Sequence, residues 1–464
     1  MNLKNKRFVF WLIDNKTNIK ISQSKLIEFL ANSGFYKAKI SNTKFLLVYE
    51  KENRVSEIED TVVIDYVSKY LKEIGNTKII EEFSKGVSSY INKTKLKLLP
   101  KTELINDRDI EKNSYFFFKN ICCQVGDNKI KEIKYENFKN KIWESRVLEN
   151  EYDSKQLTKS QFEKFCYNLS GKNDVRYLAL QTNIGYLLHR NNDSKNSRAL
   201  IFIDENISYD GTANGGTGKS LLLQAIGKCR ELVVVDGKNL KSKSWFKNQR
   251  IKLTTDIIFY DDVNRDFSLE ELYSMITTGI TVDKKYKDEI YIKPENAPKI
   301  AISSNYIVKG TGGNTDTRRR CEFEVANHYN GDNTPFDEFN CTFFDDWDIQ
   351  EWSSFYYFMM NCVLKYFEHG LIIAKPINLK RNKLISLTNH EFVRFIETGI
   401  VEVEKWISKK VVLELFISEY QHYNNISSHR FTKWMKSYAK DKDLIYEDRK
   451  SENKYEFYLK PKFM

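Results

Sequence analysis

Residues 211–220 read Gly-Thr-Ala-Asn-Gly-Gly-Thr-Gly-Lys-Ser, and this stretch decides the fold class. Glycines let backbone N–H groups curl around an anion, and the N-terminus of a following helix adds a partial positive charge. An apolar run, Leu200–Ile203, precedes the stretch, and a helical run, Leu221–Ile226, follows it. Ala213 stands where a first glycine is usual, but it is small. Strand, glycine-rich loop and helix in this order are the context of a phosphate-binding loop, the P-loop.

The residue types of this loop predict a site for ATP and Mg²⁺. Lys219 is expected to contact the β- and γ-phosphates, and the Ser220 hydroxyl is expected to bind the metal. The remaining nucleotide contacts are expected from Asn214, Gly215, Gly216, Thr217, Gly218 and Leu221. The competing interpretation is a glycine-rich turn that precedes Lys-Ser by chance, and the flanking strand and helix disfavour it.

A second apolar run, Ile257–Tyr260, ends in Asp261 and Asp262. In a P-loop fold we expect this strand to lie beside the strand that leads into the loop, so that both carboxylates face the metal and the attacking water. We assign Asp261 to the metal, through its water shell, and Asp262 to polarising the water. Two acids at a strand end are common, and only their place downstream of the loop favours the catalytic interpretation.

Two more segments complete the predicted site. The run Lys299–Ser304 is followed by Asn305, whose amide can orient the lytic water, although an asparagine that ends a strand is also frequent. Arg318-Arg319-Arg320 follows a glycine-rich loop. Arg319 and Arg320 are candidates for an arginine finger that stabilises charge on the phosphoryl group of a neighbouring subunit, with Arg318 as spacer. The alternative is a solvated basic turn.

The order of these segments resembles superfamily 3 helicases and, more narrowly, the poxvirus-type primase-helicase family of phages and mobile elements. The likeness covers roughly residues 105–375. Segments outside the four motifs also contribute to it: Tyr115–Asn120, Ile142–Ser145, Phe336–Phe339 and Asp345–Asp348. The first hundred or so residues are not diagnostic.

This resemblance implies a AAA+-like core, a hexameric ring, Mg-ATP hydrolysis between subunits and movement on single-stranded DNA, usually 3′ to 5′. It also implies a pore hairpin, which residues 282–291 fit. Lys284, Lys285 and Lys287 would then contact phosphates, and Tyr286 would stack on a base. An exposed charged hairpin without that role is the alternative.

We expect an α/β chain of four regions: an α+β region at 1–100, a mixed linker or collar at 101–195, the P-loop ATPase at 196–375 and a basic winged-helix region at 376–464. Strands and helices alternate in the third region, which predicts a parallel sheet. The sequence also predicts strands at Arg7–Ile13, Lys44–Tyr49 and Thr61–Ile64, and helices at Ser24–Asn32, Tyr66–Ile74, Lys159–Ser170 and Asp174–Leu188.

The tail predicts a helix from Ser427 or Ser428 to about Tyr438, followed by a hairpin. Arg430 and Lys433 lie off its apolar face, so this helix could enter a DNA groove. Packing or protein contacts are the alternative use of such a region.

Composition limits the remaining function classes. The 464 residues carry a net charge of +11, which permits a polyanionic partner without requiring one. The seven cysteines include no Cys-x-x-Cys pair, so reduced thiols are expected rather than zinc or disulfides. No apolar run approaches the ~18–20 residues that span a bilayer. We therefore expect a soluble, cytoplasmic protein with no membrane partner.

The function predicted from the sequence is an ATP-dependent DNA helicase or translocase that replicates a phage or mobile element on single-stranded or forked DNA. The alternative is an ATP-switched origin-binding or DNA-remodelling protein without processive unwinding. Primases fused to related motors resemble one another in an Asp-x-Asp pair followed by a histidine. Asp107-Arg108-Asp109 resembles the pair, but the first histidine of the chain is His189, next to the motor region. A primase is therefore not expected. A separate primase or polymerase is therefore a candidate partner.

Overall fold

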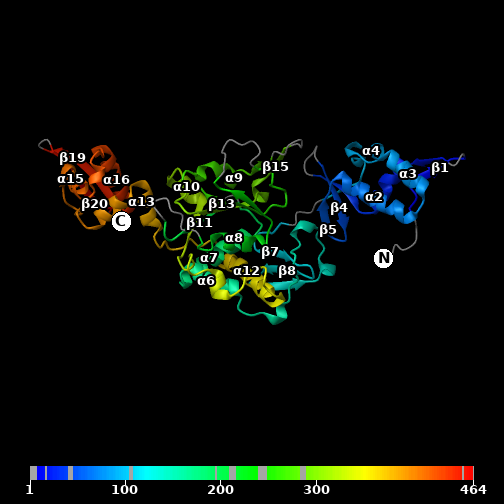
Figure 1. The fold of residues 1–464 in the computed structure, drawn as a ribbon, viewed down its shortest axis with the longest axis horizontal. Helices are drawn as coiled ribbons and strands as arrows, with labels where there is room; N and C mark the ends of the chain where they lie inside the picture. The colour runs from blue at the N-terminus through cyan, green and yellow to red at the C-terminus, as the bar shows by residue number, and fades with distance from the viewer. Residues whose placement is uncertain are drawn as a thin grey trace. The chain divides into compact units, whose positions relative to one another are not determined.

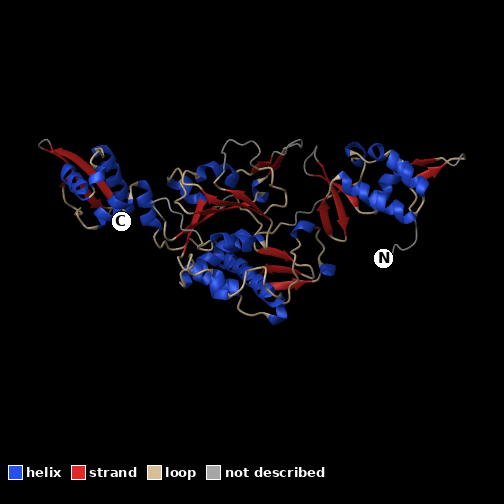
Figure 2. Ribbon diagram, in the orientation of Figure 1, coloured by secondary structure: helices blue, strands red, loops and turns tan. Residues whose placement is uncertain are grey.

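The computed structural model describes residues 8–15, 18–39, 45–103, 108–193, 196–207, 216–238, 248–282, 289–451 and 454–462. The chain divides into two compact units, Met1–Tyr152 and Asp153–Met464. Each unit mixes helices with strands (Figure 1, Figure 2). The division falls inside residues 101–195, which the sequence analysis kept together as one region. No described helix has the length and apolar character needed to cross a membrane.

The first unit contains small sheets and a group of helices. Its five-stranded sheet has the order β10-β5-β4-β3-β6, its three-stranded sheet has the order β7-β8-β9, and β1 pairs with β2. The strands are β1 (Trp11–Ile13), β2 (Ile19–Ile21), β3 (Phe35–Lys39), β4 (Phe45–Lys51), β5 (Arg54–Glu57), β6 (Lys101–Thr102), β7 (Asn113–Phe117), β8 (Cys122–Gly126), β9 (Lys129–Ile133) and β10 (Ile142–Trp143). The helices are α1 (Gln23–Asn32), α2 (Asp60–Ile74), α3 (Thr77–Lys85), α4 (Val87–Tyr90) and α5 (Lys93–Leu96).

One predicted strand in this unit is wrong. Thr61–Ile64 forms the first turns of α2 rather than a strand. Its β-branched residues favour a strand locally. However, Val63, Val67 and Leu71 follow one another at helical spacing, and all three are buried in the core of the unit. Burial of this helical stripe outweighs the local preference, because propensity is a weak term beside tertiary packing.

The second unit is built around a five-stranded parallel sheet of order β12-β13-β16-β11-β17. The strands are β11 (Ala199–Asp204), β12 (Leu232–Asp236), β13 (Ile257–Val263), β16 (Lys299–Ser304) and β17 (Arg320–Val325). Figure 1 shows α8 (Lys219–Gly227), α7 (Asp174–Leu188) and α12 (Ile349–His369) on one side and α9 (Tyr273–Thr277) on the other. The parallel sheet predicted for residues 196–375 is present.

The strand order corrects a further expectation. The acidic strand β13 does not lie beside β11, because β16 pairs with both and separates them. All six residues of β16 are buried, which suits a central strand covered on both faces. In contrast, β12 is at one edge and exposes part of its Val234 side chain. Apolar runs alone do not distinguish which buried strand is inserted between two others.

The C-terminal part of this unit has a core of its own. Its helices are α13 (Leu379–Leu387), α14 (His390–Glu397), α15 (Lys409–Glu419) and α16 (Ser428–Asp441), and its sheet is antiparallel with the order β18-β20-β19. The strands are β18 (Ile407–Ser408), β19 (Leu444–Ser451) and β20 (Lys454–Pro461). The predicted helix and hairpin are confirmed, and the Ser427 hydroxyl caps α16 by accepting the N–H of Arg430.

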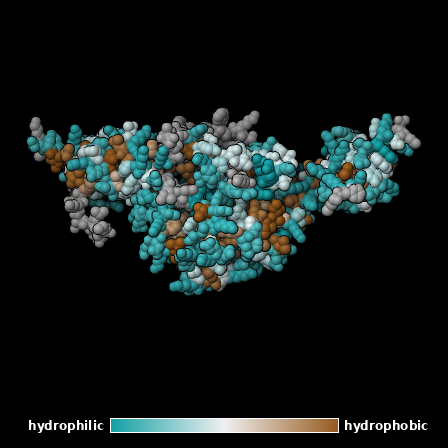
Figure 3. Space-filling view, turned by 180° about the vertical axis from the view of Figure 1, so that it is seen from behind, coloured by the Kyte–Doolittle hydropathy of each residue, from teal (hydrophilic) through white to brown (hydrophobic). Residues whose placement is uncertain are grey.

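Hydrophilic side chains cover most of the face seen in Figure 3, and apolar side chains gather there only in small groups. This distribution agrees with a chain in which 30% of the residues are charged.

Candidate active site

The carboxyl ends of β11, β13 and β16 meet at one edge of the parallel sheet. Ser304 stands in register with Ile203 on one side and with Val263 on the other. The last residues of these strands and the residues just after them therefore come together, although they are distant in sequence. The N-terminus of α8 lies at this same edge, as the contacts of Lys219 and Ser220 show.

Gly218 shapes the start of α8. Its φ of +97° lies in the left-handed region, where a side chain would be strained. A Cβ added there would also approach the Phe165 ring to 2.8 Å. Phe165 and its helical neighbour Leu169 belong to α6 (Gln161–Leu169), so this glycine lets the loop pack directly on α6. Gly216 also has a positive φ, of +93°.

Lys219 lies at the centre of a hydrogen-bonded group. Its Nζ is 2.5 Å from Asp204 Oδ1, 3.1 Å from Asn305 Oδ1 and 3.2 Å from Thr217 Oγ1. The side chains of Lys219 and Asp204 are only 9% and 4% exposed. The lysine predicted to bind phosphate is thus held by oxygen atoms of its own chain.

Ser220 and Asp261 form a second group. Ser220 Oγ lies 3.4 Å from Asp261 Oδ1, and Ser303 Oγ donates to the same oxygen at 2.7 Å. A hydroxyl and one carboxylate fit Mg²⁺, which prefers oxygen ligands and usually keeps several waters and substrate phosphates. Within the described ranges, no three acidic, histidine or cysteine side chains are grouped as a metal cage.

Asp262 and Asn305 connect the two groups. Asn305 Nδ2 donates to Asp262 Oδ1 at 2.9 Å, while its Oδ1 accepts from Lys219. A register irregularity between Tyr260 and Val263 accompanies a φ of +50° at Asp262. This bulge re-aims the carboxylate at the edge. Lys238, just past β12, places its Nζ 2.6 Å from Asp262 Oδ2.

The three arginines have different surroundings. Arg320 is bound within its own chain, 3.0 Å from Asp316 and 3.0 Å from Glu322. The Arg319 guanidinium lies over the Tyr273 ring, 5.0 Å from its centre. Arg318, at the end of α10 (Gly313–Arg319), is exposed. The side chain expected to be a spacer is therefore the most accessible of the three.

The other predicted residues fall into three sets. Leu221 is in the first turn of α8. Asn214, Gly215, Lys284, Lys285, Tyr286 and Lys287 lie outside the described residues. The antiparallel arms of the expected hairpin are present as β14 (Ile280–Val282) and β15 (Ile290–Ile292). Arg430 and Lys433 are exposed on α16, with Arg430 5.3 Å from the centre of the Trp434 ring.

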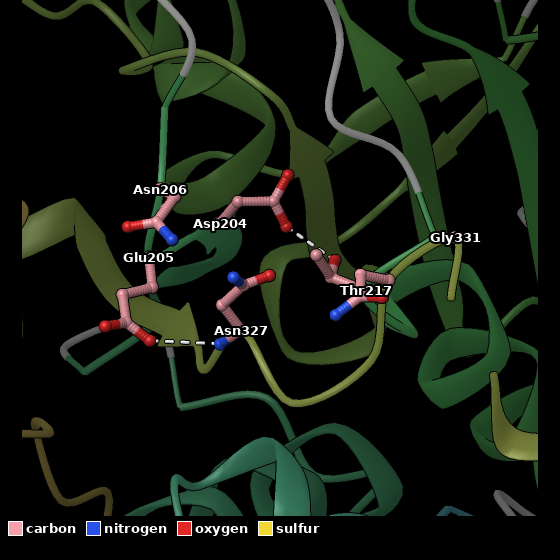
Figure 4. Close-up of a pocket in the computed structure, with 7 residues that line it drawn as sticks. Asp204, Glu205, Asn206, Thr217, Asn327 and Gly331 are labelled. Atoms are coloured by element: carbon pink, nitrogen blue, oxygen red, sulfur yellow. Dashed lines mark hydrogen bonds between the residues drawn. The ribbon is translucent and has the colours of Figure 1, made fainter. Parts of the chain in front are cut away.

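Sequence reasoning missed Asp204, Lys238 and a cavity beside the loop. The cavity has a volume of about 260 Å³ and is lined by Asp204, Glu205, Asn206, Thr217, Asn327, Asn330 and Gly331 (Figure 4). Glu205 Oε2 accepts the N–H of Asn327 at 3.0 Å. An acid at the end of the strand before the loop was the available signal for Asp204. No sequence signal pointed to the cavity, because part of its lining, Asn327–Gly331, follows β17 and is far from Asp204 along the chain.

Comparison with known proteins locates similarity in this region. A family model described as "Family of unknown function (DUF5906)" matches residues 211–320, from the glycine-rich loop to Arg320. That match covers less than half of the chain. No curated protein matches.

Three solved structures are similar at low identity. The apo A form of the NrS-1 C-terminal region shares 13% identity, with 94% of this chain and 99% of that chain covered and a TM-score of 0.42. A second apo A-form structure of that region, covering its residues 305–718, shares 13% identity, with 75% of this chain and 96% of that chain covered and a TM-score of 0.34. A JCV helicase with a substituted N-(phenoxyphenyl)acetamide bound shares 11%, with 52% and 62% covered and a TM-score of 0.26. With TM-scores below 0.5, the site's own geometry remains the basis for assigning a function.

Proposed function

We propose that this protein is a P-loop ATPase with a AAA+-like core that drives movement along DNA, as a replicative helicase or translocase of a phage or mobile element. One observation carries the proposal. Lys219, Asn305 and Asp262 form a continuous hydrogen-bonded chain at the carboxyl edge of a parallel sheet, next to Ser220 and Asp261. Ligands of open α/β sheets bind outside the carboxyl ends of the strands.

Each of these side chains has a role in the proposed reaction. Bound Mg-ATP would supply the phosphoryl group and the cation that neutralises its charge. Lys219 would contact the phosphates, and Ser220 and Asp261 would hold the metal. Asp262 would polarise the attacking water. Asn305, which holds Asp262 at 2.9 Å, would orient that water beside it.

The DNA-binding surfaces and the ring are part of the same proposal. The hairpin arms β14 and β15 would present Lys284, Lys285, Tyr286 and Lys287 to single-stranded DNA in the pore of a hexamer. The α15, α16 and β18-β20-β19 arrangement would act as a winged helix, and the exposed Arg430 and Lys433 would contact phosphates of forked DNA. A separate primase or polymerase would supply primers in the host cytoplasm.

ATP turnover and strand displacement test the function. The full chain should hydrolyse ATP with Mg²⁺, faster with single-stranded DNA, and should displace a strand from a forked duplex. Hydrolysis without displacement would favour the alternative, a protein that remodels an origin without processive unwinding. Absence of ATP binding and hydrolysis would contradict the proposal itself. The mass of the assembly with ATP and DNA bound tests the hexamer.

Salt dependence of DNA binding tests the tail. Counterions leave when cationic side chains meet phosphates, so affinity should fall steeply with salt. Arg430→Ala with Lys433→Ala should reduce the slope by about one unit per true phosphate contact. Lys365→Ala, a change of a partly exposed lysine on α12 that pairs with Glu368, is the control. An unchanged slope in the double variant would remove α16 from the DNA path.

A further inference from the structure

The closest contact of the Lys219 ammonium group is one that phosphate binding does not need. Asp204 Oδ1 accepts from Lys219 Nζ at 2.5 Å and also from Thr217 Oγ1 at 2.5 Å. Figure 4 shows the Asp204 carboxylate directed at Thr217 across the edge of the cavity. Both charged side chains are more than nine-tenths buried. The positive charge of Lys219 is therefore balanced inside the protein by the carboxylate of Asp204, at the end of β11.

We infer that Asp204 is a positioning residue that restrains Lys219 in the nucleotide-free protein and sets a threshold for nucleotide binding. The inference rests on the proposed function, since it assumes that Lys219 receives the phosphates. A phosphate group and the Asp204 carboxylate are both anions that compete for one ammonium group. The three N–H donors of this ammonium group already have acceptors, Asp204 Oδ1, Asn305 Oδ1 and Thr217 Oγ1, so a phosphate must displace one of them. Repulsion between the two anions makes the Asp204 ion pair the contact that weakens.

The sign of the effect follows from two costs that act in the same direction. Weakening the pair loses a charge-assisted hydrogen bond, which is among the stronger polar contacts in proteins. It also leaves a buried carboxylate near the incoming phosphates, where repulsion is strong because little water screens it. Thr217 Oγ1 would remain as a neutral donor to Asp204. An uncharged side chain of the same shape at position 204 removes both costs.

Asp204→Asn is the decisive variant. It should lower the Kd for ATP about tenfold or more, the scale expected for one charge-assisted hydrogen bond. In steady state KM should fall while kcat stays the same or decreases. A purely structural role would not move KM downward. Asp204→Glu keeps the charge and should return Kd toward that of the wild type. Weaker ATP binding in Asp204→Asn would overturn the inference, because Asp204 would then assist binding.

Glu205→Gln is the matched control. Glu205 lines the same cavity, next to Asp204, and no hydrogen bond or ion pair joins it to Lys219 among the described residues. Its removal should leave the Kd for ATP within about twofold, because distant charge alone has a small effect in a solvated cavity. An equal tightening by Glu205→Gln would mean that the cavity's overall negative charge, and not the ion pair, opposes nucleotide binding; the inference would fail.

Nucleotide-free stability separates this inference from the proposed function. Urea unfolding of the full chain with Asp204→Asn, Lys219→Met and both changes together measures the coupling between the two side chains. A coupling of about tenfold or more in the folding equilibrium supports the pair, and additive effects overturn it. Failure of the wild type to bind ATP would instead overturn the proposed function, with the coupling still measurable.

The same experiment remains informative if Asp204→Asn folds poorly. At a fixed concentration, a ligand that binds only the folded state stabilises it more when its Kd is lower, and the gain grows with the logarithm of the affinity. ATP should then raise the Tm of Asp204→Asn by more than it raises the Tm of the wild type. A smaller rise in Asp204→Asn would overturn the inference.

Discussion

The carboxyl edge of the sheet and the arginine helix α10 both carry basic side chains suited to phosphate, yet they hold them differently. At the edge, Lys219 contacts Asp204, Thr217 and Asn305 of its own chain. On α10 and just after it, one arginine is ion-paired, one is stacked, and Arg318 has no ion pair within the described part of the chain. At the edge the cation is held by side chains of its own chain, whereas on α10 the Arg318 side chain is exposed.

The largest expected effect tests the edge. Lys219→Ala should lower ATP turnover to the assay background, because the main side-chain contact to the transferring phosphate is lost. Steady-state ATPase measurements check this. Lys228→Ala, an exposed change just beyond α8, is the control and should keep full activity. Turnover of the Lys219 variant within threefold of wild type would show that this loop is not the active one.

The next effect tests α10 and separates its arginines. Arg318→Ala together with Arg319→Ala should leave ATP bound and lower turnover by ~10³-fold, the scale of an arginine finger. Arg320→Ala should instead lower the free energy of unfolding by about 1–3 kcal/mol, because Asp316 and Glu322 lose a shared cation while Tyr273 and Lys383 still contact them. ATPase and urea unfolding measure the two effects.

Mixing variants sharpens the same comparison. In the proposed ring, mixing the Arg318 and Arg319 double variant with Lys219→Ala would give some interfaces with an intact lysine and intact arginines. Partial ATPase should return. No recovery in verified mixed oligomers would contradict a shared site, and full activity of a verified monomer would contradict the ring.

A smaller effect is expected at Asp262. Asp262→Asn preserves shape but cannot polarise water, so turnover should fall ~10²-fold with the Kd for ATP little changed. Asp266→Asn, an exposed acid a few residues further on, is the control. Loss of ATP binding equal to the loss of turnover would mean that Asp262 supports the loop structurally.

The smallest expected effect concerns Glu338, whose carboxylate contacts helix α6. Burial raises the pKa of Glu338, but hydrogen bonds from Lys164, Tyr329, His328 and Asn168 outweigh it and lower the pKa to about 2. Lys164 and Asn168 lie on α6, on which Gly218 packs. Glu338→Gln should therefore cost about 2 kcal/mol of folding free energy at pH 7.

The sign with pH follows from the lowered pKa. The carboxylate contributes its full stability above the ordinary value of 4.5, and loses it as pH falls through about 2. Urea unfolding should show the difference between wild type and Glu338→Gln shrinking over that window. Asp332→Asn, an exposed change in the same segment, is the control. A difference that stays constant with pH would contradict the ionic role.

Helices and strands whose signals lie within a few neighbouring residues could be predicted from the sequence. The strand β11 and the helix α8 on either side of the glycine-rich stretch follow from residues next to one another, and the helix Asp174–Leu188 matches α7 at both ends. The Ser427 cap of α16 is local as well. The strand predicted at Thr61–Ile64 is wrong because this short β-branched run is part of a helical stripe whose packing partners lie elsewhere in the chain.

The sequence by itself determined the types of side chain available to the site and the elements that carry them. Only the tertiary structure decided which of these side chains meet. The insertion of β16 between β11 and β13 and the pairing of Asp204 with Lys219 both depend on it. Helical periodicity and caps act within a few residues, whereas strand order and buried ion pairs depend on how distant segments share one core.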